Sequence, residues 1–512
     1  MNDQQTKLTT QVVIIGAGPT GLSMAAQLLR YNIDFIILEK NERTTHLSKA
    51  IAVQARTLEI FDEIDLAGKA IEEGQVITGA NLFYKGKRKA LINLSGLGTG
   101  LSSFPFALSL EQSKTEKLLA DHLTDQGMKI MWSTEFTHFV QDNKSAEVYF
   151  RYKDGEEQVI HTSYLVGCDG AGSKLRHQLD LNFQGDTIPK IFYVADVVLK
   201  SSVINRNELY MFMIRKGFVL FFPMEGSDHY RVIGILPDTE DLNEYFTFDD
   251  IKDTIREHVK VSLEFVKEIW FSSYKVHSRK ATSFQKGRCF IAGDAAHIHT
   301  PAGGQGMNTG IQDVYNLAWK LAFTLNGKIN NDVLLTYDLE RSENARHLLR
   351  STDRMFDIMA GVNPLMNFIR LNIFTRILKM ITSRAFVKRR IFPLISQTGI
   401  KYDQNILTIK SSIGKVQSGV RIPFFVFPGG KHIFEYLKEP NFKLLFFSRT
   451  KQNAIIDFTD IKIKPVFLFF DYIPSSLFGN HSDFYILLRP DNHISYIGKE
   501  VGKCFQILKV SV

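Results

Sequence analysis

An apolar strand that runs into a glycine-rich turn and then a helix opens this chain and most strongly limits its fold. Residues 12–15 form the apolar run VVII, which predicts a buried parallel strand. The turn GAGPTG at 16–21 follows, and residues 22–29 have the apolar spacing of a helix. This order predicts the opening of a Rossmann-like domain in an α/β fold.

Each residue of the turn has a physical reason for its place. Gly16 permits the tight turn, Gly18 lets the backbone approach a pyrophosphate, and Gly21 lets the helix pack closely on the strand. The helix start, with Pro19 and Thr20 in its first turn, offers unpaired N–H groups to an anion. The turn therefore predicts a dinucleotide site.

A second apolar strand, at 35–38, ends at an acidic residue, Glu39. Its carboxylate is placed to accept hydrogen bonds from both ribose hydroxyls, which favours an adenine dinucleotide without a 2′-phosphate. Lys40 follows directly and is predicted to belong to the same cofactor-binding set.

Length and composition narrow the class of protein. At 512 residues the chain predicts about three domains. Cys168, Cys289 and Cys504 have no CxxC spacing, and no leader pattern precedes the first strand, so we expect a cytoplasmic protein without disulfides or metal. No apolar stretch reaches the roughly 20 residues of a membrane span. A net charge of +8 without an RNA-binding motif predicts no nucleic-acid partner.

The rest of the chain changes pattern in blocks. Residues 181–280 are mainly β and predict a second sheet inserted into the first domain. Residues 281–400 are mostly helical, and 401–512 predict a separate small α/β domain, in which a turn at 489–492 joins two strands. A helix is predicted over 110–123, with Ser113 and Glu116 as a capping box.

Two further motifs place acids at strand ends. Asp169-Gly170 follows the buried strand at 164–166, and Gly293-Asp294 follows the strand at 290–292. An acid in such a position can bind a sugar-chain hydroxyl. The segment 301–308 leads into another helix, whose first N–H groups can face a carbonyl oxygen.

Taken together, these motifs resemble those of the group A FAD-dependent aromatic hydroxylases, single-component flavoprotein monooxygenases of the phenol hydroxylase, hydroxyphenylpropionate hydroxylase and rifampicin monooxygenase type. The resemblance covers roughly residues 10–345 and includes GAGPTGL, IAVQARTLEIF, VGCDGAGSKLR and GDAAHIHTPAGGQGMNTGIQDVYNLAWKLA. It implies an FAD-binding domain of the glutathione reductase type in two parts, 1–180 and 281–400. The sheet at 181–280 becomes the substrate domain. The tail at 401–512 is similar to a thioredoxin-like domain, without its CxxC pair.

The resemblance also implies residue roles toward noncovalent FAD. Glu39 is implied to bind the ribose, Asp169 to serve both FAD and the nicotinamide cofactor, and Asp294 to bind the ribityl or pyrophosphate portion. The remaining implied cofactor contacts are Lys49, Gln112, Pro301, Gly306, Met307 and Asn308.

The reaction that the resemblance implies uses NADPH or NADH and O₂. A flavin C4a-hydroperoxide would transfer one oxygen atom to an aromatic, phenolic or polyketide-like small molecule, in some members inactivating an antibiotic. Only one dinucleotide fingerprint is present, so the nicotinamide would visit without its own Rossmann domain. Arg43, Lys49 and Arg56 are candidates to meet its phosphates or guide the flavin, although solvated helix charge explains them equally well.

The substrate end of the site is less determined. The catalytic base is not identified; the candidates are His46, His297, His299, Tyr193 and Asp196. The predicted cavity walls are Phe212, Arg215, Phe221, Phe222 and Pro301, with ordinary sheet packing as the alternative. No residue is predicted to bind a metal.

Other functions remain open alternatives. A flavin-dependent halogenase is disfavoured because Trp132, Trp270 and Trp319 are isolated, and a flavin-dependent reductase or a non-oxygenating FAD-binding protein shares the same motifs. The basic segment 370–390 is compatible with a membrane-surface helix, but a packed helix with a solvated face is favoured. We expect a monomer or a homodimer.

Overall fold

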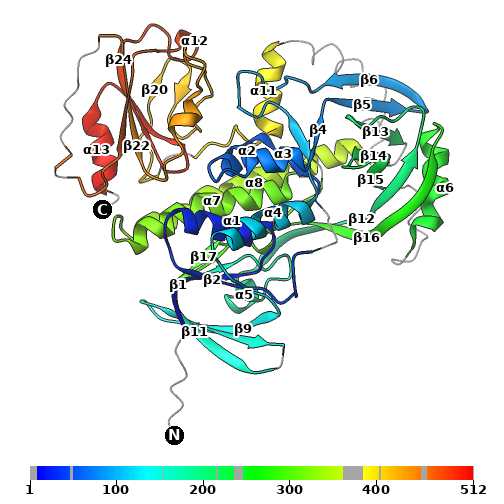
Figure 1. Cartoon of the computed structure of the whole chain (residues 1–512), viewed down its shortest axis with the longest axis horizontal. Coiled ribbons are helices and arrows are strands. Elements are labelled where there is room, and N and C mark those ends of the chain that lie inside the picture. The colour runs from blue at the N-terminus through cyan, green and yellow to red at the C-terminus, as the bar shows by residue number, and fades with distance from the viewer. Residues whose placement is uncertain are drawn as a thin grey trace.

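Two eight-stranded sheets and a smaller four-stranded sheet form the framework of the chain (Figure 1). The structure is a computed structural model that describes residues 8–45, 50–153, 155–214, 217–235, 246–301, 303–360, 385–402, 405–450, 458–459 and 461–510. Among these residues, no helix combines the length and apolar character needed to cross a membrane.

The first sheet is largely parallel and is built around the N-terminal strand. Its order is β17-β18-β11-β1-β2-β8, and β10 and β9 extend it from β11. The strands are β1 (Leu8–Ile15), β2 (Phe35–Leu38), β8 (Ile130–Met131), β9 (Thr134–Gln141), β10 (Ala146–Tyr152), β11 (Glu157–Gly167), β17 (Gln285–Lys286) and β18 (Cys289–Ile291). The inner strands are buried on both faces, as parallel sheets require.

Helices pack on or beside the two large sheets. They are α1 (Pro19–Arg30), α2 (Ala55–Asp62), α3 (Ala67–Glu72), α4 (Gln112–Asp125), α5 (Lys174–Gln178), α7 (Gly306–Leu325), α8 (Asp332–Ala360) and α11 (Ala385–Ile395). A 3₁₀ turn, η1 (Gly293–Ala295), follows β18. A small sheet joins β3 (Ala52–Val53), β7 (Ala107–Ser109) and β4 (Gln75–Ile77).

The second sheet has the order β19-β16-β12-β15-β14-β13-β5-β6. Its strands are β5 (Gly79–Tyr84), β6 (Lys87–Asn93), β12 (Phe183–Lys200), β13 (Glu208–Ile214), β14 (Gly217–Pro223), β15 (His229–Ile235), β16 (Glu264–Ala281) and β19 (His297–Ile298). Helix α6 (Phe248–Val259) lies on the outer side of this sheet (Figure 1). The sequence analysis missed that β5 pairs with β13 and that β6 extends the sheet beyond β5, because both strands lie far from β13 along the chain.

The C-terminal sheet has the order β23-β22-β24-β25, in which β22 and β23 are parallel and the other pairs are antiparallel. The elements of this part are β20 (Ser412–Ile413), β21 (Val416–Gln417), η3 (Ile433–Tyr436), β22 (Lys443–Ser448), β23 (Val466–Phe470), α12 (Ser475–Phe478), β24 (Asp483–Leu488), β25 (Ile494–Gly498) and α13 (Val501–Val510). The predicted hairpin over 489–492 is confirmed, because β24 and β25 pair across it.

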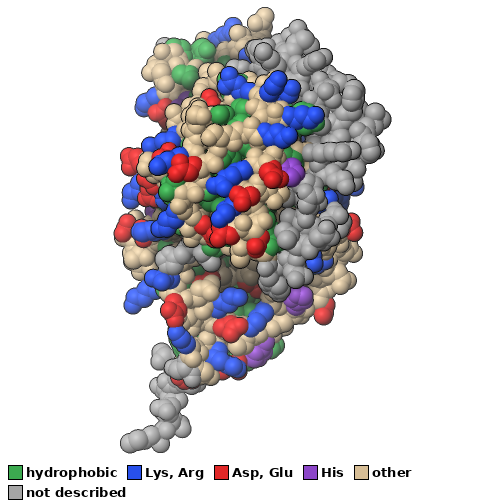
Figure 2. Space-filling view, turned by 90° about the vertical axis from the view of Figure 1, so that its right-hand side faces the viewer, with side chains coloured by type: hydrophobic (Ala, Val, Ile, Leu, Met, Phe, Trp, Pro, Cys, Tyr) green, Lys and Arg blue, Asp and Glu red, His purple; other side chains and the backbone are tan. Residues whose placement is uncertain are grey.

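Figure 2 shows one face of the molecule, where acidic and basic side chains are mixed over most of the described surface. The net positive charge is therefore not gathered into one continuous basic surface on that face.

Candidate flavin site

The three sequence motifs meet at one edge of the first sheet. Ile15 at the end of β1 is in register with Gly167 at the end of β11, and Gly167 is in register with Ile291 at the end of β18. The glycine turn, Asp169-Gly170 and Gly293-Asp294 follow these three strand ends directly. Parallel strands place the segments after their carboxyl ends together, and this is where α/β sheets bind ligands.

The glycines of the first turn are required by close packing. Gly16 has φ +99°, and a Cβ there would lie 2.5 Å from the carbonyl oxygen of Cys168. A Cβ at Gly21 would collide with the carbonyl of Gly16. A Cβ at Gly18 would meet nothing within 4 Å, and this residue precedes Pro19 at the start of α1. The backbone at Gly18 is thus open to a ligand at a helix N-terminus.

Thr20 locks the first motif to the third. A Cβ added at Gly293, where φ is +59°, would lie 2.5 Å from the Thr20 hydroxyl oxygen, and a Cβ at Gly310 would collide with the same oxygen. Thr20 therefore fills the space between η1 and α7. The sequence analysis missed Gly310; a glycine one turn after Gly306 in a helix was the available signal.

Glu39 holds the glycine turn from the neighbouring strand. It is 8% exposed, its Oε2 accepts a 2.7 Å hydrogen bond from the Ala17 N–H, and its Oε1 accepts one of 2.9 Å from the Asn41 N–H. Lys40, which lies between Glu39 and Asn41 in the chain, is exposed. The carboxylate lies beside the turn at the end of β2.

The two other predicted acids lie in different surroundings. Asp169 is half-buried; its Oδ2 accepts a hydrogen bond of 3.3 Å from the Leu175 N–H, and burial raises the pKa of the carboxyl group. Its Oδ1 has no hydrogen-bond partner among the described residues. Asp294 is exposed on η1. Both can therefore meet a ligand at this edge.

The start of α7 is tied to the segment before α2. Asn308 is fully buried, and its Oδ1 accepts hydrogen bonds from the Gln54 N–H at 2.9 Å and the Thr57 hydroxyl at 2.7 Å. Its side-chain amide donates to the Ala52 carbonyl at 2.8 Å. The Asn308 side chain therefore holds the protein together, and only its backbone N–H remains for a ligand. Met307 is buried in the core.

Pro301 is half-buried, and its carbonyl oxygen accepts a hydrogen bond of 3.1 Å from the Gly304 N–H in the turn before α7. Gly306 is the first residue of α7. These two predicted contacts therefore lie at the beginning of the helix that Asn308 anchors.

Helix α4 holds the backbone at Thr45 and at Ala50. The Glu116 Oε2 accepts a hydrogen bond of 2.9 Å from the Thr45 N–H, and the Ala50 carbonyl accepts one of 3.0 Å from the Gln112 N–H. The predicted capping box of Ser113 and Glu116 is wrong, because Glu111 is the N-cap residue and makes no side-chain cap. Glu116 instead binds Thr45 and the Gln112 amide. His46 and Lys49 lie outside the described residues.

Arg56 is not the solvated helix charge that its pattern allowed. It is 2% exposed, pairs with Glu59 at 3.1 Å, and donates to the Asp491 carbonyl at 2.9 Å. These contacts occupy it within the protein, so a role on the nicotinamide phosphates is not supported. Arg43 is exposed.

The two faces of the second sheet separate the predicted cavity walls. Phe212 and Phe221 are buried in the apolar core that also contains α6, on the outer side of the sheet. That packing does not support the prediction that they line a cavity. Phe222 is half-buried and, by strand alternation, lies on the opposite face. Arg215 lies outside the described residues.

The candidate bases have structural partners or unsuitable surroundings. The Nε2 of His297 lies 2.7 Å from Oδ2 of Asp313, and Asp196 is paired with Arg231. Burial lowers the pKa of His299 to about 4, and Tyr193 lies in the apolar core with α6, where burial raises its pKa. None of these residues is poised as a base, so the catalytic base stays unassigned.

In the described part of the chain, no group of three His, Cys, Asp or Glu is arranged to hold a metal ion. Cys168, Cys289 and Cys504 are free and buried.

Comparison with known families agrees with this geometry. Residues 9–352 match the family described as FAD binding domain, and the chain belongs to that family. The match spans all three motifs and the second sheet.

The relatives share an activity class. The chain is 30% identical over 458 residues to 6-methylpretetramide 4-monooxygenase of Streptomyces rimosus, covering 86% of this chain and 79% of that protein. It is 30% identical over 404 residues to rifampicin monooxygenase of Streptomyces venezuelae, covering 77% and 79%. The solved OxyS anhydrotetracycline hydroxylase from Streptomyces rimosus matches with a TM-score of 0.77 and 26% identity, covering 98% of this chain and 99% of that one.

The chain is thus an FAD-dependent monooxygenase, an oxidoreductase of the group A flavoprotein type. NAD(P)H is the typical co-substrate of this class.

Proposed function

We propose that this enzyme hydroxylates a polycyclic aromatic or polyketide-like small molecule, with FAD bound at the edge where β1, β11 and β18 end. The convergence of the three motifs at that edge carries the proposal. The named substrates of two relatives, a pretetramide and rifampicin, are both large ring systems, and support this substrate class. An antibiotic-inactivating oxidation belongs to the same proposal.

The residues present fit a dinucleotide at this edge. The open backbone at Gly18 and the N-terminus of α1 suit a pyrophosphate, because unpaired N–H groups there attract an anion. Glu39 lies beside this turn for a ribose, and the exposed Asp294 is placed for the ribityl or pyrophosphate portion. The backbone N–H groups at Met307 and Asn308, at the start of α7, are proposed to meet the isoalloxazine.

Bound FAD supplies the redox chemistry, accepting reducing equivalents from NAD(P)H and activating O₂ for transfer of one oxygen atom. The protein supplies position. Asn308 keeps the start of α7 against residues 52–57, and Thr20 fixes η1 against α7. Backbone dipoles held in fixed positions need no reorganisation when charge develops in the reaction.

The substrate is proposed to lie against the inner face of the second sheet, opposite α6. Phe222 and Leu220 share that face by alternation, as does the Asp196–Arg231 pair. Trp270 adds an aromatic surface, with its ring 5.9 Å from the Arg231 guanidinium carbon. An apolar wall with one charged pair suits a ring system that carries hydroxyl groups.

We further propose the division into a two-part FAD-binding domain, a substrate domain and a C-terminal domain. The order β23-β22-β24-β25, with one parallel pair and a closing helix α13, supports a thioredoxin-like C-terminal domain. Pairing of β5 with β13, and of β6 with β5, adds residues 79–93 to the sheet of the substrate domain. A structural or oligomer-forming role suits a tail that has one cysteine.

The test combines cofactor retention with product analysis. Purified enzyme should hold FAD without a covalent bond, and Asp294→Ala should lose most of it. The oxidation of NADPH and of NADH is then followed by stopped flow in the presence of phenols, tetracyclines and rifamycins. Mass spectrometry of the products shows whether one oxygen atom has been added. Flavin reduction without oxygen transfer to any of these would favour the reductase alternative.

A further inference from the structure

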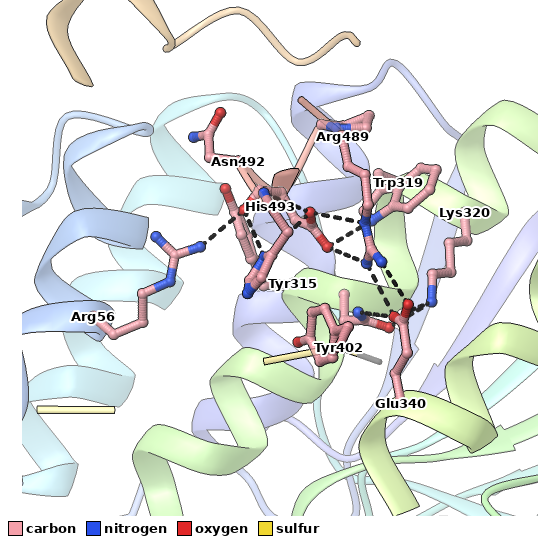
Figure 3. Close-up of polar contacts among 12 residues, drawn as sticks. Arg56, Tyr315, Trp319, Lys320, Glu340, Tyr402, Arg489, Asn492 and His493 are labelled. Atoms are coloured by element: carbon pink, nitrogen blue, oxygen red, sulfur yellow. Dashed lines mark hydrogen bonds and ion pairs between the residues drawn. The ribbon is translucent and has the colours of Figure 1, made fainter. Parts of the chain in front are cut away.

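A buried carboxylate, Glu340 on α8, joins three parts of the chain (Figure 3). Its Oε2 accepts hydrogen bonds from the Lys320 ammonium at 2.8 Å and the Arg489 guanidinium at 3.0 Å. The side-chain amides of Asn316 and Asn405 also donate to it, at 2.7 and 2.8 Å. Arg489 comes from the C-terminal hairpin, so Glu340 binds that hairpin to α7 and α8.

Asp491 provides the second anion of the hairpin. It pairs with Arg489 and accepts a 3.3 Å hydrogen bond from the Trp319 indole N–H on α7. Its backbone carbonyl accepts the bond from Arg56 on α2. The charges balance, since Glu340 and Asp491 face Arg489 and Lys320, and such pairing is what makes buried charge tolerable.

Tyr402 connects this network to the flavin edge. Its ring lies 4.9 Å from the Arg489 guanidinium carbon and 4.4 Å from the His493 ring. Its hydroxyl accepts a hydrogen bond of 3.1 Å from Arg341 Nη1. One face of Tyr402 thus contacts the C-terminal hairpin, and its hydroxyl contacts α8.

Arg341 passes the contact to the third motif through Asp313. The Arg341 Nε donates to Asp313 Oδ1 at 2.7 Å, and both side chains are fully buried. Asp313 Oδ2 accepts a hydrogen bond of 3.0 Å from the Gly293 N–H and lies 2.7 Å from Nε2 of His297. The same carboxylate therefore fixes η1, with Asp294, against α7.

We infer that the C-terminal hairpin 489–493 positions the flavin site through Tyr402, Arg341 and Asp313. Tyr402, Arg341 and Asp313 are positioning residues, because each acts on the cofactor through another group. The inference rests on the proposed placement of FAD beside Asp294 and the start of α7. Its consequence is that the C-terminal domain contributes to FAD affinity without touching FAD.

Close packing is the reason that the position of the hairpin affects the position of η1 and α7. Each member is buried and hydrogen-bonded, so a shift of one leaves a charged or polar group unpaired. Binding of FAD that orders η1 and α7 must in turn stabilise the hairpin, because coupling between two sites is reciprocal.

The mutational test removes one oxygen atom. Tyr402→Phe keeps the ring against Arg489 and His493 and deletes the acceptor of the Arg341 bond. The matched control is Tyr496→Phe, which is also buried in the C-terminal part and whose hydroxyl accepts a long hydrogen bond of 3.4 Å from the Glu500 N–H. FAD dissociation constants, flavin midpoint potentials and unfolding temperatures of the apoproteins are measured for both.

We expect Tyr402→Phe to weaken FAD binding by about five- to tenfold and to shift the midpoint potential, with Tyr496→Phe unchanged. Equal affinity in both variants, or a loss that only follows apoprotein stability, overturns the inference. The Asp294→Ala variant distinguishes a failure of the proposed FAD site from a failure of the inference about the hairpin. If it keeps FAD, the proposed site is wrong; if it loses FAD while Tyr402→Phe does not, only the inference fails.

A second measurement uses the unmodified enzyme and needs no variant to fold. Amide hydrogen exchange is followed with and without FAD. Saturating FAD should slow exchange in the hairpin 489–493 but not in the edge strand β23 of the same sheet. Unchanged exchange in the hairpin contradicts the coupling.

Discussion

The guanidinium of Arg231 on β15 forms a bidentate ion pair with the carboxylate of Asp196 on β12. The Nε–Oδ1 and Nη2–Oδ2 distances are both 2.7 Å, and the two residues are directly opposite in the strand register. The remaining nitrogen, Nη1, donates to the Ala50 carbonyl at 3.2 Å. One guanidinium therefore joins the second sheet to Ala50, which the Gln112 N–H of α4 also contacts.

Asp196→Asn should destabilise the enzyme by about 3–5 kcal/mol, because it leaves a buried guanidinium without its counter-charge. The Arg231 side chain is 0% exposed and that of Asp196 only 10%, so solvent offers little screening. Urea unfolding provides the measurement. Asp249→Asn is the control, since that side chain is 76% exposed in its pair with Lys252. Equal midpoints for the two variants would contradict the assigned strength of the buried pair.

Phe221 and Phe222 should respond in opposite ways to truncation. Phe221→Ala leaves a cavity in the core with α6 and should cost about 3–5 kcal/mol of stability with little change in substrate KM. Phe222→Ala should raise the KM for substrate with a smaller loss of stability, because Phe222 lies on the proposed substrate face. Steady-state kinetics beside thermal unfolding distinguishes them, and the reverse pattern would place the substrate on the other face.

Gly310→Ala should greatly reduce FAD retention. The added methyl group collides with the Thr20 hydroxyl and must push α7 away from α1. Thr20→Ala in the same chain removes that oxygen and should restore part of the retention, which absorbance of bound flavin measures. Failure of the double variant to recover any flavin would show that the collision with Thr20 is not the cause.

Lys443 should make stability depend on pH above neutrality. Burial lowers its pKa from 10.5 to about 7, while Asn492 Oδ1 accepts its hydrogen bond at 2.9 Å. Between these two pKa values the unfolded chain binds the extra proton, so stability rises with pH, by at most about 1.4 kcal/mol per pH unit.

The measurement is the unfolding free energy of the wild type and of Lys443→Met at pH 7, 8 and 9. The variant cannot titrate at this position, so the unfolding free energy of the wild type should rise relative to that of the variant as the pH increases. Parallel curves would mean that Lys443 keeps its proton in the folded enzyme.

The flavin edge was predictable because its constraints are local. Gly16 permits the tight turn, Gly21 permits close packing of α1, and Glu39 follows the end of β2. Each of these roles depends on residues close by in the chain or on a regular parallel register. The burial of Arg56 was not predictable in this way. Its sequence surroundings fit a solvated helix equally well, and its partner Asp491 lies 435 residues away.

The same limit applies to Asn308 and to Phe221. The helix start at Asn308 was recognised, but its side-chain partners at Gln54 and Thr57 lie more than 250 residues earlier. The strand of Phe221 was recognised, whereas the face it occupies depends on where α6 packs. Local pattern predicts an element; which neighbour covers each face is decided by the whole fold.

The spread of the flavin edge along the chain has a consequence for biosynthesis. A ribosome releases the glycine turn long before it has made Gly293, Asp313 or the hairpin that ends at His493. An unfinished chain therefore lacks the partners that order the turn, and a domain that waits for distant contacts folds late. We expect FAD to bind only after Gly293 and Asp313 have been made, so that a shortage of the cofactor leaves apoprotein as a substrate for chaperones and proteases.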